Sequence, residues 1–484
     1  MALLPELWRA ATSGAEALVD NPLTRAITGQ ETVRLAVTGL SRAGKTVFLT
    51  SLIANLLAAG SGARTLPALE KAAGGRLRGV RVLPAGIETV PRFDHAAHLA
   101  ALAADPPRWP SRTEDFSTFA LTLVIERAGA FRHLSPQRTV TLELLDYPGE
   151  WLLDLPMLAQ DFPEWSAATL RRLGQGPRAA AFAPFRAFLD ALPPGAPADD
   201  ALFRRGYTLY RDALIECRDR HGLHLLQPGR FLNPGPRGET PLLWFFPLPA
   251  GHAGSLAELC ARRYDAYRED QRTGFLDPFL RRFDRQVVLA DVLGALHAGP
   301  DSFADTAEAL ALISSSLRGT ASWLDWLRLD WLGLDWLRAT PPKVVFAATK
   351  ADHVPTRQRE ALISLLRDLT GTVAPPNALP APDGGAAHAI AAVRCTEDTV
   401  YPLPQPEGPP RPVAAVRGVL LENGRAATVY PGEVPLRRPD AEFWEHAYFR
   451  MPVFQPPRID PAGNTGVPHL GMDTLLGALI GDLL

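Results

Sequence analysis

Lysine is scarce in this chain of 484 residues, which carries 50 lysine and arginine residues in total. The only lysines are Lys45, Lys71, Lys343 and Lys350. Two of them, Lys45 and Lys350, lie in short patterns that also contain threonine and a glycine or an aspartate. Because arginine supplies nearly all other positive charge, these two lysines indicate positions that require a compact ammonium group rather than a planar guanidinium fork.

The chain also lacks a strong net charge and has few cysteines. Its formal net charge is -2 at pH 7, so the sequence provides no overall basic field for nucleic-acid binding. Three cysteines, Cys217, Cys260 and Cys395, are far apart and have no metal-ligand spacing. An odd number of isolated cysteines is typical of a reducing compartment, so we expect a cytoplasmic protein. From the net charge we expect that it does not bind nucleic acid.

No stretch of the sequence approaches the roughly 18 uninterrupted apolar residues that a membrane-spanning helix requires. The N-terminal segment carries Glu6, Glu16 and Asp20 where a secretory signal would be apolar. We therefore expect no transmembrane segment, and any membrane contact would be peripheral. The 46% content of hydrophobic residues is enough for a large core, and the length favours two or three domains.

Residues 39–46 read Gly-Leu-Ser-Arg-Ala-Gly-Lys-Thr and match the phosphate-binding pattern G-x-x-x-x-G-K-[ST] in full. An apolar run at 32–38 and a helical pattern at 45–59 flank them, which predicts a strand, a glycine loop and a helix. Backbone N–H groups and the helix N-terminus would then point at phosphates. Lys45 would bridge the β- and γ-phosphates, and the Thr46 hydroxyl would bind Mg²⁺. The predicted nucleotide contacts of this loop are Gly39, Ser41, Arg42, Ala43, Gly44, Lys45, Thr46 and Val47.

A second pattern, Asp146-Tyr-Pro-Gly149-Glu150, follows an apolar run at 139–145. A D-x-x-G sequence alone often marks an ordinary turn, but after a buried strand and downstream of a phosphate loop it indicates a nucleotide-sensing segment. Asp146 would hold Mg²⁺ through water, and Gly149 would let a backbone N–H approach the γ-phosphate. Glu150 occupies the position of the water-orienting glutamine of many small GTPases. Its carboxylate adds negative charge near the transition state, so we expect slow hydrolysis.

The third pattern, Thr349-Lys350-Ala351-Asp352, follows an apolar run at 343–348 and predicts guanine as the base. The Asp352 carboxylate can accept hydrogen bonds from guanine N1–H and its exocyclic amine, which adenine cannot supply. Helix capping is the alternative role for Asp352. The loop after Val393 would place a backbone N–H near guanine O6, and Cys395 would pack as a small residue rather than act as a reactive thiol. The predicted contacts of the base are Thr349, Lys350, Asp352, His353, Arg394 and Cys395.

A further magnesium-binding threonine is expected between the first helix and Asp146. Thr113 ends the string Arg-Trp-Pro-Ser-Arg-Thr at 108–113 and precedes a predicted strand at 119–125, and Thr118 is the alternative. Together with Thr46 and Asp146, Thr113 completes the predicted metal ligands.

Apolar runs of strand length recur at residues 32–38, 119–125, 139–145, 286–290, 343–348 and 389–393. Most are separated by helical segments, which predicts an α/β fold with a mostly parallel sheet, a P-loop NTPase G-domain, whose ligand lies at the carboxyl ends of the strands. An arginine-rich helical pattern predicts a large helical insertion. The expected division is an amphipathic N-terminal helix (1–30), the first part of the G-domain (31–150), the insertion (151–283), the second part of the G-domain (284–400), and a C-terminal segment (401–484) that completes it. That last segment contains a hairpin at 416–430, turning at Asn423-Gly424, and a helix at 472–484.

Residues 324–338 repeat the sequence Leu-Asp-Trp-Leu three times with a period of five. Five residues advance about 140° around a helix, so Trp326, Trp331 and Trp336 would spread around the axis and form no single apolar face. One interpretation is a tolerant loop that packs in part on the insertion. The other is an aromatic element that docks on a membrane interface or a partner.

The strings GLSRAGKTVFLTSL, PPRWPSRT, LLDYPGEWLLDLP, FAATKADHV and AAVRCTED together resemble the YcjX-like family of bacterial P-loop GTPases over nearly the whole chain. The resemblance implies a G-domain with a large helical insertion, binding of GTP and GDP, an association with envelope stress and a partner among inner-membrane proteins. Matched residue by residue, it supports Gly39, Gly44, Lys45, Thr46, Asp146, Gly149, Lys350 and Asp352. The tryptophan repeat departs from the family pattern.

Three hypotheses about function follow from these patterns. The first is a slow, magnesium-dependent GTPase whose nucleotide state controls a switch, with GTP or GDP as ligand and the insertion transmitting the change. The second is a P-loop ATPase or kinase, against which Asp352 stands. The third is a scaffold that binds nucleotide for structure and docks a membrane protein.

Overall fold

The computed structural model describes residues 30–84, 91–111, 116–127, 136–235, 238–276, 280, 283–322, 342–371, 387–405, 408–445 and 451–484. The predicted N-terminal helix, Thr113 and the tryptophan repeat lie outside these residues. Of the described chain, Pro148–Arg282 and the residues from Ala298 to 322 form one compact unit, called here the helical unit. Residues 30–147, Phe283–His297 and the residues from 342 onward form the other, called the sheet unit. Residues 298–322 thus group with the helical unit, although the sequence placed them in the second part of the G-domain.

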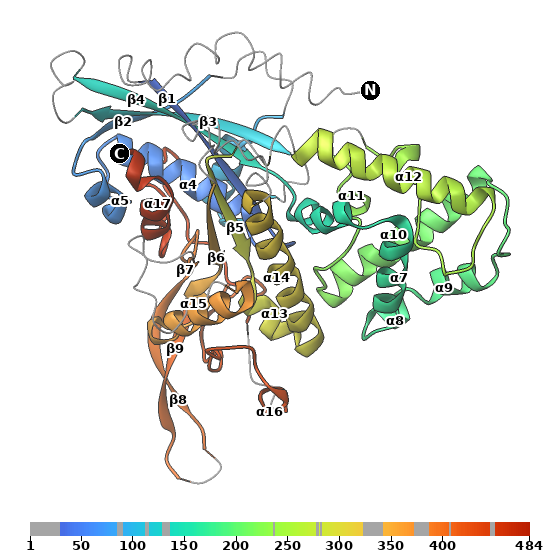
Figure 1. Cartoon of the computed structure of the whole chain (residues 1–484). Coiled ribbons are helices and arrows are strands. Elements are labelled where there is room, and N and C mark those ends of the chain that lie inside the picture. The colour runs from blue at the N-terminus through green and yellow to red at the C-terminus, as the bar shows by residue number, and fades with distance from the viewer. Residues whose placement is uncertain are drawn as a thin grey trace. The chain divides into compact units, whose positions relative to one another are not determined.

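The sheet unit contains a seven-stranded sheet of order β2-β3-β4-β1-β5-β6-β7 (Figure 1). The five strands from β4 to β7 in this order pair in parallel, and β2 and β3 add an antiparallel edge. This arrangement confirms the predicted α/β fold with a mostly parallel sheet. The strands are β1 (Gln30–Gly39), β2 (Leu77–Val82), β3 (Ser117–Glu126), β4 (Gln137–Asp146), β5 (Arg285–Ala290), β6 (Lys343–Ala348) and β7 (Ala387–Ala389).

One predicted strand of this sheet was wrong in its bounds, and one strand was not predicted. The strand predicted at 389–393 is instead β7, which ends at Ala389, and Ala391 forms an isolated antiparallel bridge with Leu470. Strand β2 was not predicted, because only Val80 of its six residues is buried. A strand at the edge of a sheet with one solvated face needs no continuous apolar run.

One face of the sheet is covered by α4 (Lys45–Gly60), α5 (Pro67–Ala72) and α17 (Met472–Ile480). Their apolar side chains, among them Phe48 and Leu475, join those of β1, β3 and β4 in one buried cluster. Helix α4 begins at Lys45 as predicted, so the phosphate-binding pattern lies between β1 and the first turn of a helix held by this core. The unit also contains α6 (His95–Ala103), α13 (Val292–Ala298), η9 (Ala351–His353), α15 (Thr356–Thr370), α16 (Ala441–Trp444) and η10 (Gly481–Leu483).

A second sheet of three antiparallel strands has the order β10-β9-β8. Strands β9 (Arg411–Val419) and β10 (Ala426–Val429) form the predicted hairpin, and Gly424 has a φ of 67° at its turn, which favours glycine. Strand β8 (Thr396–Leu403) was not predicted, because only its first residue is buried. Since β8 begins directly after Cys395, the second sheet continues from the predicted base-binding loop.

The helical unit confirms the large helical insertion of the predicted fold. Its core is rich in aromatic side chains, and Trp165 stacks on Tyr264 with their ring centroids 5.1 Å apart. Asp305, on α14 (Pro300–Ser322), accepts a hydrogen bond from Leu225 N at 2.9 Å and pairs with the buried Arg178. The elements are η2 (Gly149–Ala159), α7 (Phe162–Leu173), α8 (Arg178–Ala181), α9 (Ala183–Asp190), α10 (Asp200–His221), α11 (Gly229–Leu232), η3 (Pro241–Leu243), α12 (Ser255–Gln271), η4 (Arg272–Leu276) and α14 (Pro300–Ser322).

The 3-10 helix η2 is held in the helical unit by Asp154, whose side chain is 1% exposed. Both carboxylate oxygens accept from Gly229 N, at 2.8 and 2.9 Å, and Oδ2 also accepts from the Tyr267 hydroxyl at 2.6 Å. Gly229 approaches so closely that a Cβ there would lie 2.1 Å from the Glu150 carbonyl oxygen. These contacts make η2 an integral part of the helical unit.

We expect Asp154→Ala to destabilise the helical unit by about 3 kcal/mol, because two buried donors lose a shared acceptor. Burial raises the pKa of Asp154 to about 7, against the opposing effect of Tyr267 and Gly229. The folded-state pKa lies above the unfolded value, so the contribution of this carboxyl to stability is lost as pH rises from about 4 to about 7. The isosteric Asp154→Asn does not titrate and should gain stability relative to the native protein over that range. Urea unfolding at several pH values measures this, and a constant difference would contradict the assignment.

Candidate functional site

The predicted motifs meet at the carboxyl ends of neighbouring parallel strands. Val37 of β1 pairs with Asp146 of β4, and Gly39 at the end of β1 pairs with Leu289 of β5. The last residues of β5 and β6 also pair, so Thr349 follows β6 beside the end of β5. Because all these strands run in the same direction, the phosphate loop, Asp146 and the Thr349–Asp352 segment share one edge of the sheet.

The two glycines of the phosphate loop, Gly39 and Gly44, are each required for a different structural reason. A Cβ at Gly39 would lie 2.5 Å from the Leu289 carbonyl oxygen, so this position needs glycine for close approach to β5. Gly44 has a φ of 83° and forms the N-cap of α4. The loop turns between them through a hydrogen bond from Ala43 N to Leu40 O at 3.1 Å. The sequence pattern therefore reflects local backbone geometry.

The N-terminus of α4 suits an anion. No acidic residue lies in its first turn, and the helix has 16 residues, so its end carries partial positive charge. Lys45 is half-buried, and its ammonium lies 3.5 Å from the Gly39 carbonyl oxygen. Burial raises the pKa of the Asp146 carboxyl to about 6, although the positive charge of Lys45 partly opposes this rise.

The oxygen atoms beside Lys45 fit a magnesium ion. The Asp146 side chain is 2% exposed, and within the described residues its buried Oδ1 has no hydrogen-bond partner. Thr46, on the first turn of α4, is 8% exposed. A carboxylate and a hydroxyl are hard oxygen donors, and Mg²⁺ prefers one or two such ligands together with phosphate and water. Thr46 and Asp146 are the side chains that would hold it.

The Thr349–Asp352 loop is held by backbone hydrogen bonds to neighbouring segments and by an ion pair of Lys350. Thr349 N donates to Ala290 O at 2.9 Å, and Ala351 N donates to Ile390 O at 3.0 Å. Lys350 has a φ of 60°, a conformation that costs free energy for a residue with a Cβ. Its ammonium pairs with Asp291, which directly follows β5 and belongs to none of the sequence patterns. The position of Asp291, an acidic residue directly after the predicted strand at 286–290, could have indicated that it belongs to the site.

The structure brings Asp352 and the Cys395 loop, both predicted to contact the base, next to each other. The Asp352 side chain is 2% exposed, and its Oδ2 accepts from Cys395 N at 2.8 Å. The hydroxyl of Thr396 donates to the Asp352 backbone carbonyl. Arg394 N donates to Pro468 O at 2.7 Å, so the N–H groups of Arg394 and Cys395 both have partners within the chain. Burial raises the pKa of the Cys395 thiol, as expected for a packed rather than a reactive cysteine.

His353 connects this loop to a segment that the sequence did not associate with it. Its Nδ1 lies 3.2 Å from Asp352 Oδ1, and its ring centroid lies 5.1 Å from that of Phe454. The Phe454 carbonyl accepts from Trp109 Nε1 at 2.9 Å. Trp109 belongs to the string that ends at Thr113, so the chain leading to the predicted magnesium-binding threonine is tied to the predicted base-binding loop.

Gly149 and Glu150 lie in the first turn of η2, within the helical unit. Glu150 is 5% exposed, and its backbone packs against Gly229 of α11. Tyr147, the residue before Pro148, belongs to the sheet unit, where Gln286 Nε2 donates to its hydroxyl at 2.6 Å. The D-x-x-G segment therefore runs from one unit into the other, and Glu150 is part of a packed element.

The register of β3 bears on the choice between the two threonines. Thr118 pairs with Leu145, whereas Ser117 pairs with Asp146. Because successive side chains of a strand point to opposite faces, Thr118 does not share the face of Asp146. This disfavours Thr118 as a magnesium ligand, while Thr113 lies outside the described residues.

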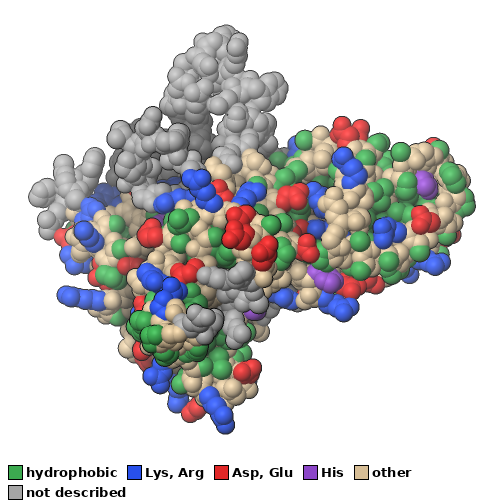
Figure 2. Space-filling model, turned by 90° about the horizontal axis from the view of Figure 1, so that it is seen from below, with side chains coloured by type: hydrophobic (Ala, Val, Ile, Leu, Met, Phe, Trp, Pro, Cys, Tyr) green, Lys and Arg blue, Asp and Glu red, His purple; other side chains and the backbone are tan. Residues whose placement is uncertain are grey.

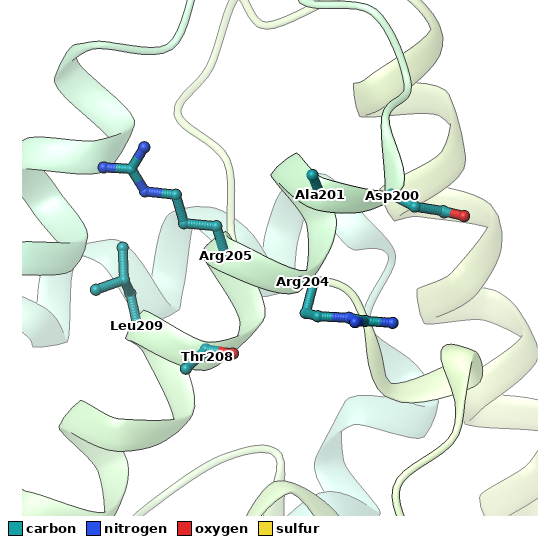
Figure 3. Close-up of a pocket in the computed structure, with 6 residues that line it drawn as sticks. All are labelled: Asp200, Ala201, Arg204, Arg205, Thr208 and Leu209. Atoms are coloured by element: carbon teal, nitrogen blue, oxygen red, sulfur yellow. The ribbon is translucent and has the colours of Figure 1, made fainter.

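A surface hollow of about 550 Å³ in the helical unit is separate from these residues (Figure 3). All of its lining residues belong to α10, and Arg204 among them lies over the Trp244 ring at 4.8 Å from its centroid.

On the face drawn in Figure 2, Lys and Arg side chains are interspersed with Asp and Glu side chains. Among the residues that the structure describes, no helix is both long and apolar enough to span a membrane.

The sheet order, the glycine loop before α4 and the acidic residue at the end of β4 define an α/β protein of the P-loop NTPase class with a helical insertion. The chain belongs to the YcjX-like family, because the family model described as "YcjX-like family, DUF463" matches residues 33–484. It is 38% identical over 468 residues to the Ras-like GTPase YcjX of Escherichia coli strain K12, covering 93% of this chain and 96% of that protein. It is also 33% identical over 483 residues to the Ras-like GTPase YcjX of Shewanella oneidensis strain MR-1, covering 94% and 96% of the two chains.

Proposed function

We propose that this protein binds guanine nucleotides with Mg²⁺ and hydrolyses GTP slowly. The observation that carries the proposal is the convergence of Lys45, Asp146 and Asp352 at the carboxyl ends of neighbouring parallel strands. The names of the two relatives, each a Ras-like GTPase, support the same activity. In this proposal the sheet supplies a rigid frame, and the loops at its carboxyl edge supply the chemistry.

The base would be read by Asp352. Its carboxylate is buried and already oriented by Cys395 N and His353, so little conformational freedom is lost when a base binds. Guanine offers N1–H and an exocyclic amine to such a carboxylate, whereas adenine has an acceptor at N1. The Lys350 stem would lie along the base, with its ammonium held by Asp291. The arrangement favours guanine over adenine.

The phosphates would lie at the N-terminus of α4. Lys45 and the N–H groups of the glycine loop would neutralise charge on the β- and γ-phosphates, while Thr46 and Asp146 hold Mg²⁺, which spreads the charge that develops during phosphoryl transfer. The carboxylate of Glu150 would disfavour additional negative charge if it lies near the transferred group. Slow turnover, below roughly 1 s⁻¹, is the expected result.

Competition binding of GDP against ADP tests the base, and single-turnover hydrolysis of GTP tests the reaction. Preference for ADP would support the ATPase or kinase alternative instead. Binding of GDP without any turnover of GTP would support a nucleotide-stabilised scaffold. Both experiments use the full chain.

We further propose that the nucleotide state acts on the helical unit through Gly149. This residue follows Asp146 closely in sequence and begins η2, which Asp154 fastens to α11 and α12. A γ-phosphate that draws the Gly149 backbone toward it would therefore pull on a packed unit rather than on an isolated loop.

Glu150→Gln is expected to change the chemical step of GTP hydrolysis by several-fold and to leave GDP affinity within about twofold. Glutamine has nearly the same shape and removes the negative charge, so the packing against Gly229 should persist. Single-turnover hydrolysis beside equilibrium GDP binding measures both quantities. Equal losses in the two would mean that Glu150 maintains the fold, and no change in either would place it away from the γ-phosphate.

Three further proposals follow. The isolated cysteines support a cytoplasmic location, and the family resemblance supports a link to envelope stress and a partner among inner-membrane proteins. The last two predict that the protein fractionates in part with membranes in a nucleotide-dependent way. Fractionation of cells that carry the native protein or Lys45→Ala tests this. Equal distribution of the two proteins would argue against a nucleotide-controlled membrane partner.

A further inference from the structure

Ser117, the first residue of β3, lies directly opposite Asp146 in the antiparallel pairing of β3 with β4. Residues paired in this way have Cβ atoms about 4.5–5.5 Å apart and project to the same face of the sheet. The proposed magnesium-binding carboxylate thus has a serine as its cross-strand neighbour. No pattern in the sequence marks this serine, because the neighbour relation exists only once the two strands pair.

The shared face is the one that α4 covers. Along β3, Phe119, Leu121 and Leu123 alternate with Ser117 on the buried side and belong to the same apolar cluster as Phe48 of α4. Along β4, Leu142 and Leu144 alternate with Asp146 and belong to that cluster as well. Ser117 and Asp146 are the polar ends of these two apolar rows, on the side of the sheet where α4 packs.

Both residues are buried, and each has one side-chain oxygen without a hydrogen-bond partner among the described residues. Ser117 is 4% exposed and Asp146 is 2% exposed. Within the part of the chain that the structure describes, neither Ser117 Oγ nor Asp146 Oδ1 makes a hydrogen bond. Leaving a buried polar atom unpaired costs free energy, so two such atoms on directly opposed residues need an explanation. A water molecule held between them would satisfy both, since ordered buried waters bind two to four polar partners.

We propose that Ser117 is a positioning residue of the magnesium–nucleotide site, and this rests on the function proposed above. Its hydroxyl and Asp146 Oδ1 hold one water of the magnesium hydration shell. Mg²⁺ retains several of its waters in proteins, and these need oriented acceptors and donors around them. Ser117 thereby couples the first residue of β3 to the bound metal.

The test compares the ratio of GDP dissociation constants in EDTA and in excess Mg²⁺, measured with a fluorescent GDP, for the native protein and for Ser117→Ala. We expect the alanine variant to lose about tenfold of the magnesium-dependent gain in affinity, with GDP affinity in EDTA unchanged. The melting temperature without nucleotide should not fall, because the substitution removes an unpaired buried hydroxyl. Thr122→Val is the matched control, since Thr122 lies on the same strand but on the opposite face.

An unchanged ratio in Ser117→Ala would overturn the proposal, as would an equal loss in Thr122→Val, which would point to a general effect on β3. If Ser117→Ala does not fold, Ser117→Cys decides by the same ratio, because a thiol is similar in size but a weak hydrogen-bonding group. A native protein that binds GDP equally well with and without Mg²⁺ would contradict the proposed magnesium site itself. Failure of that premise is thus distinguished from failure of the role of Ser117.

Discussion

Lys45→Ala is expected to lower the affinity for GDP at least tenfold, roughly 1.4 kcal/mol or more, while the protein stays folded. The ammonium follows Gly44 at the N-terminus of α4, where it would meet the phosphates, and its only hydrogen bond among the described residues is a long one to the Gly39 carbonyl. Truncation therefore removes phosphate contacts and little packing. Equilibrium binding of a labelled GDP measures the loss, with circular dichroism as the check on folding.

Lys71→Ala is the matched control for this change. Lys71 is one of the other lysines of the chain and is exposed on α5 in the same sheet unit. Its removal alters the net charge by the same amount, so long-range electrostatic effects are shared by the two variants. If both variants bind GDP alike, or if folded Lys45→Ala binds as well as the native protein, Lys45 does not contact the phosphates.

Asp352→Asn is expected to transfer preference from guanine to xanthine nucleotides, with a loss of GDP affinity of about a hundredfold or more. The new amide NH₂ can donate to the 2-oxo group of xanthine, whereas the amine of guanine would face another donor. One side-chain oxygen remains to accept from Cys395 N, so the loop should keep its conformation. Competition of GDP against XDP reports the exchange.

The gain of XDP binding is the internal control of that experiment, because a variant that merely unfolds loses both nucleotides. Loss of GDP without gain of XDP in a folded protein would indicate that Asp352 supports the loop through Cys395 and His353. Continued preference for GDP would show that another residue reads the base.

The parts of the site that could be predicted from the sequence are those in which chemistry and backbone geometry coincide within a few residues. Gly39 and Gly44 are required by a close approach and a positive φ, and both requirements lie inside one short pattern. Asp146 ends β4 and Asp352 lies in the loop that follows β6, and the apolar character of both strands is evident from the sequence. Local patterns of this kind also predicted α4 and the β9–β10 hairpin.

The parts that could not be predicted depend on pairing between distant segments. Ser117 acquires its place only through the register of β3 with β4, and Asp291 only because β5 and β6 are neighbours. Strand β2 has one buried residue, so its position at the sheet edge leaves almost no apolar signal. The packing of Glu150 against Gly229 depends on how α11 folds back on η2.

The way in which η2 is built into the helical unit has a thermodynamic consequence for any switch. In many nucleotide-controlled proteins the sensing segment orders and melts, but melting η2 would expose Trp151, Leu152 and the buried carboxylate of Asp154 to water. The less costly response is for the unit to move as one body. Coupling of this kind is reciprocal. A partner protein that binds the helical unit in one orientation should therefore change the affinity for GDP by the same factor by which GDP changes the affinity for that partner. A partner that binds the helical unit would then control the release of the nucleotide.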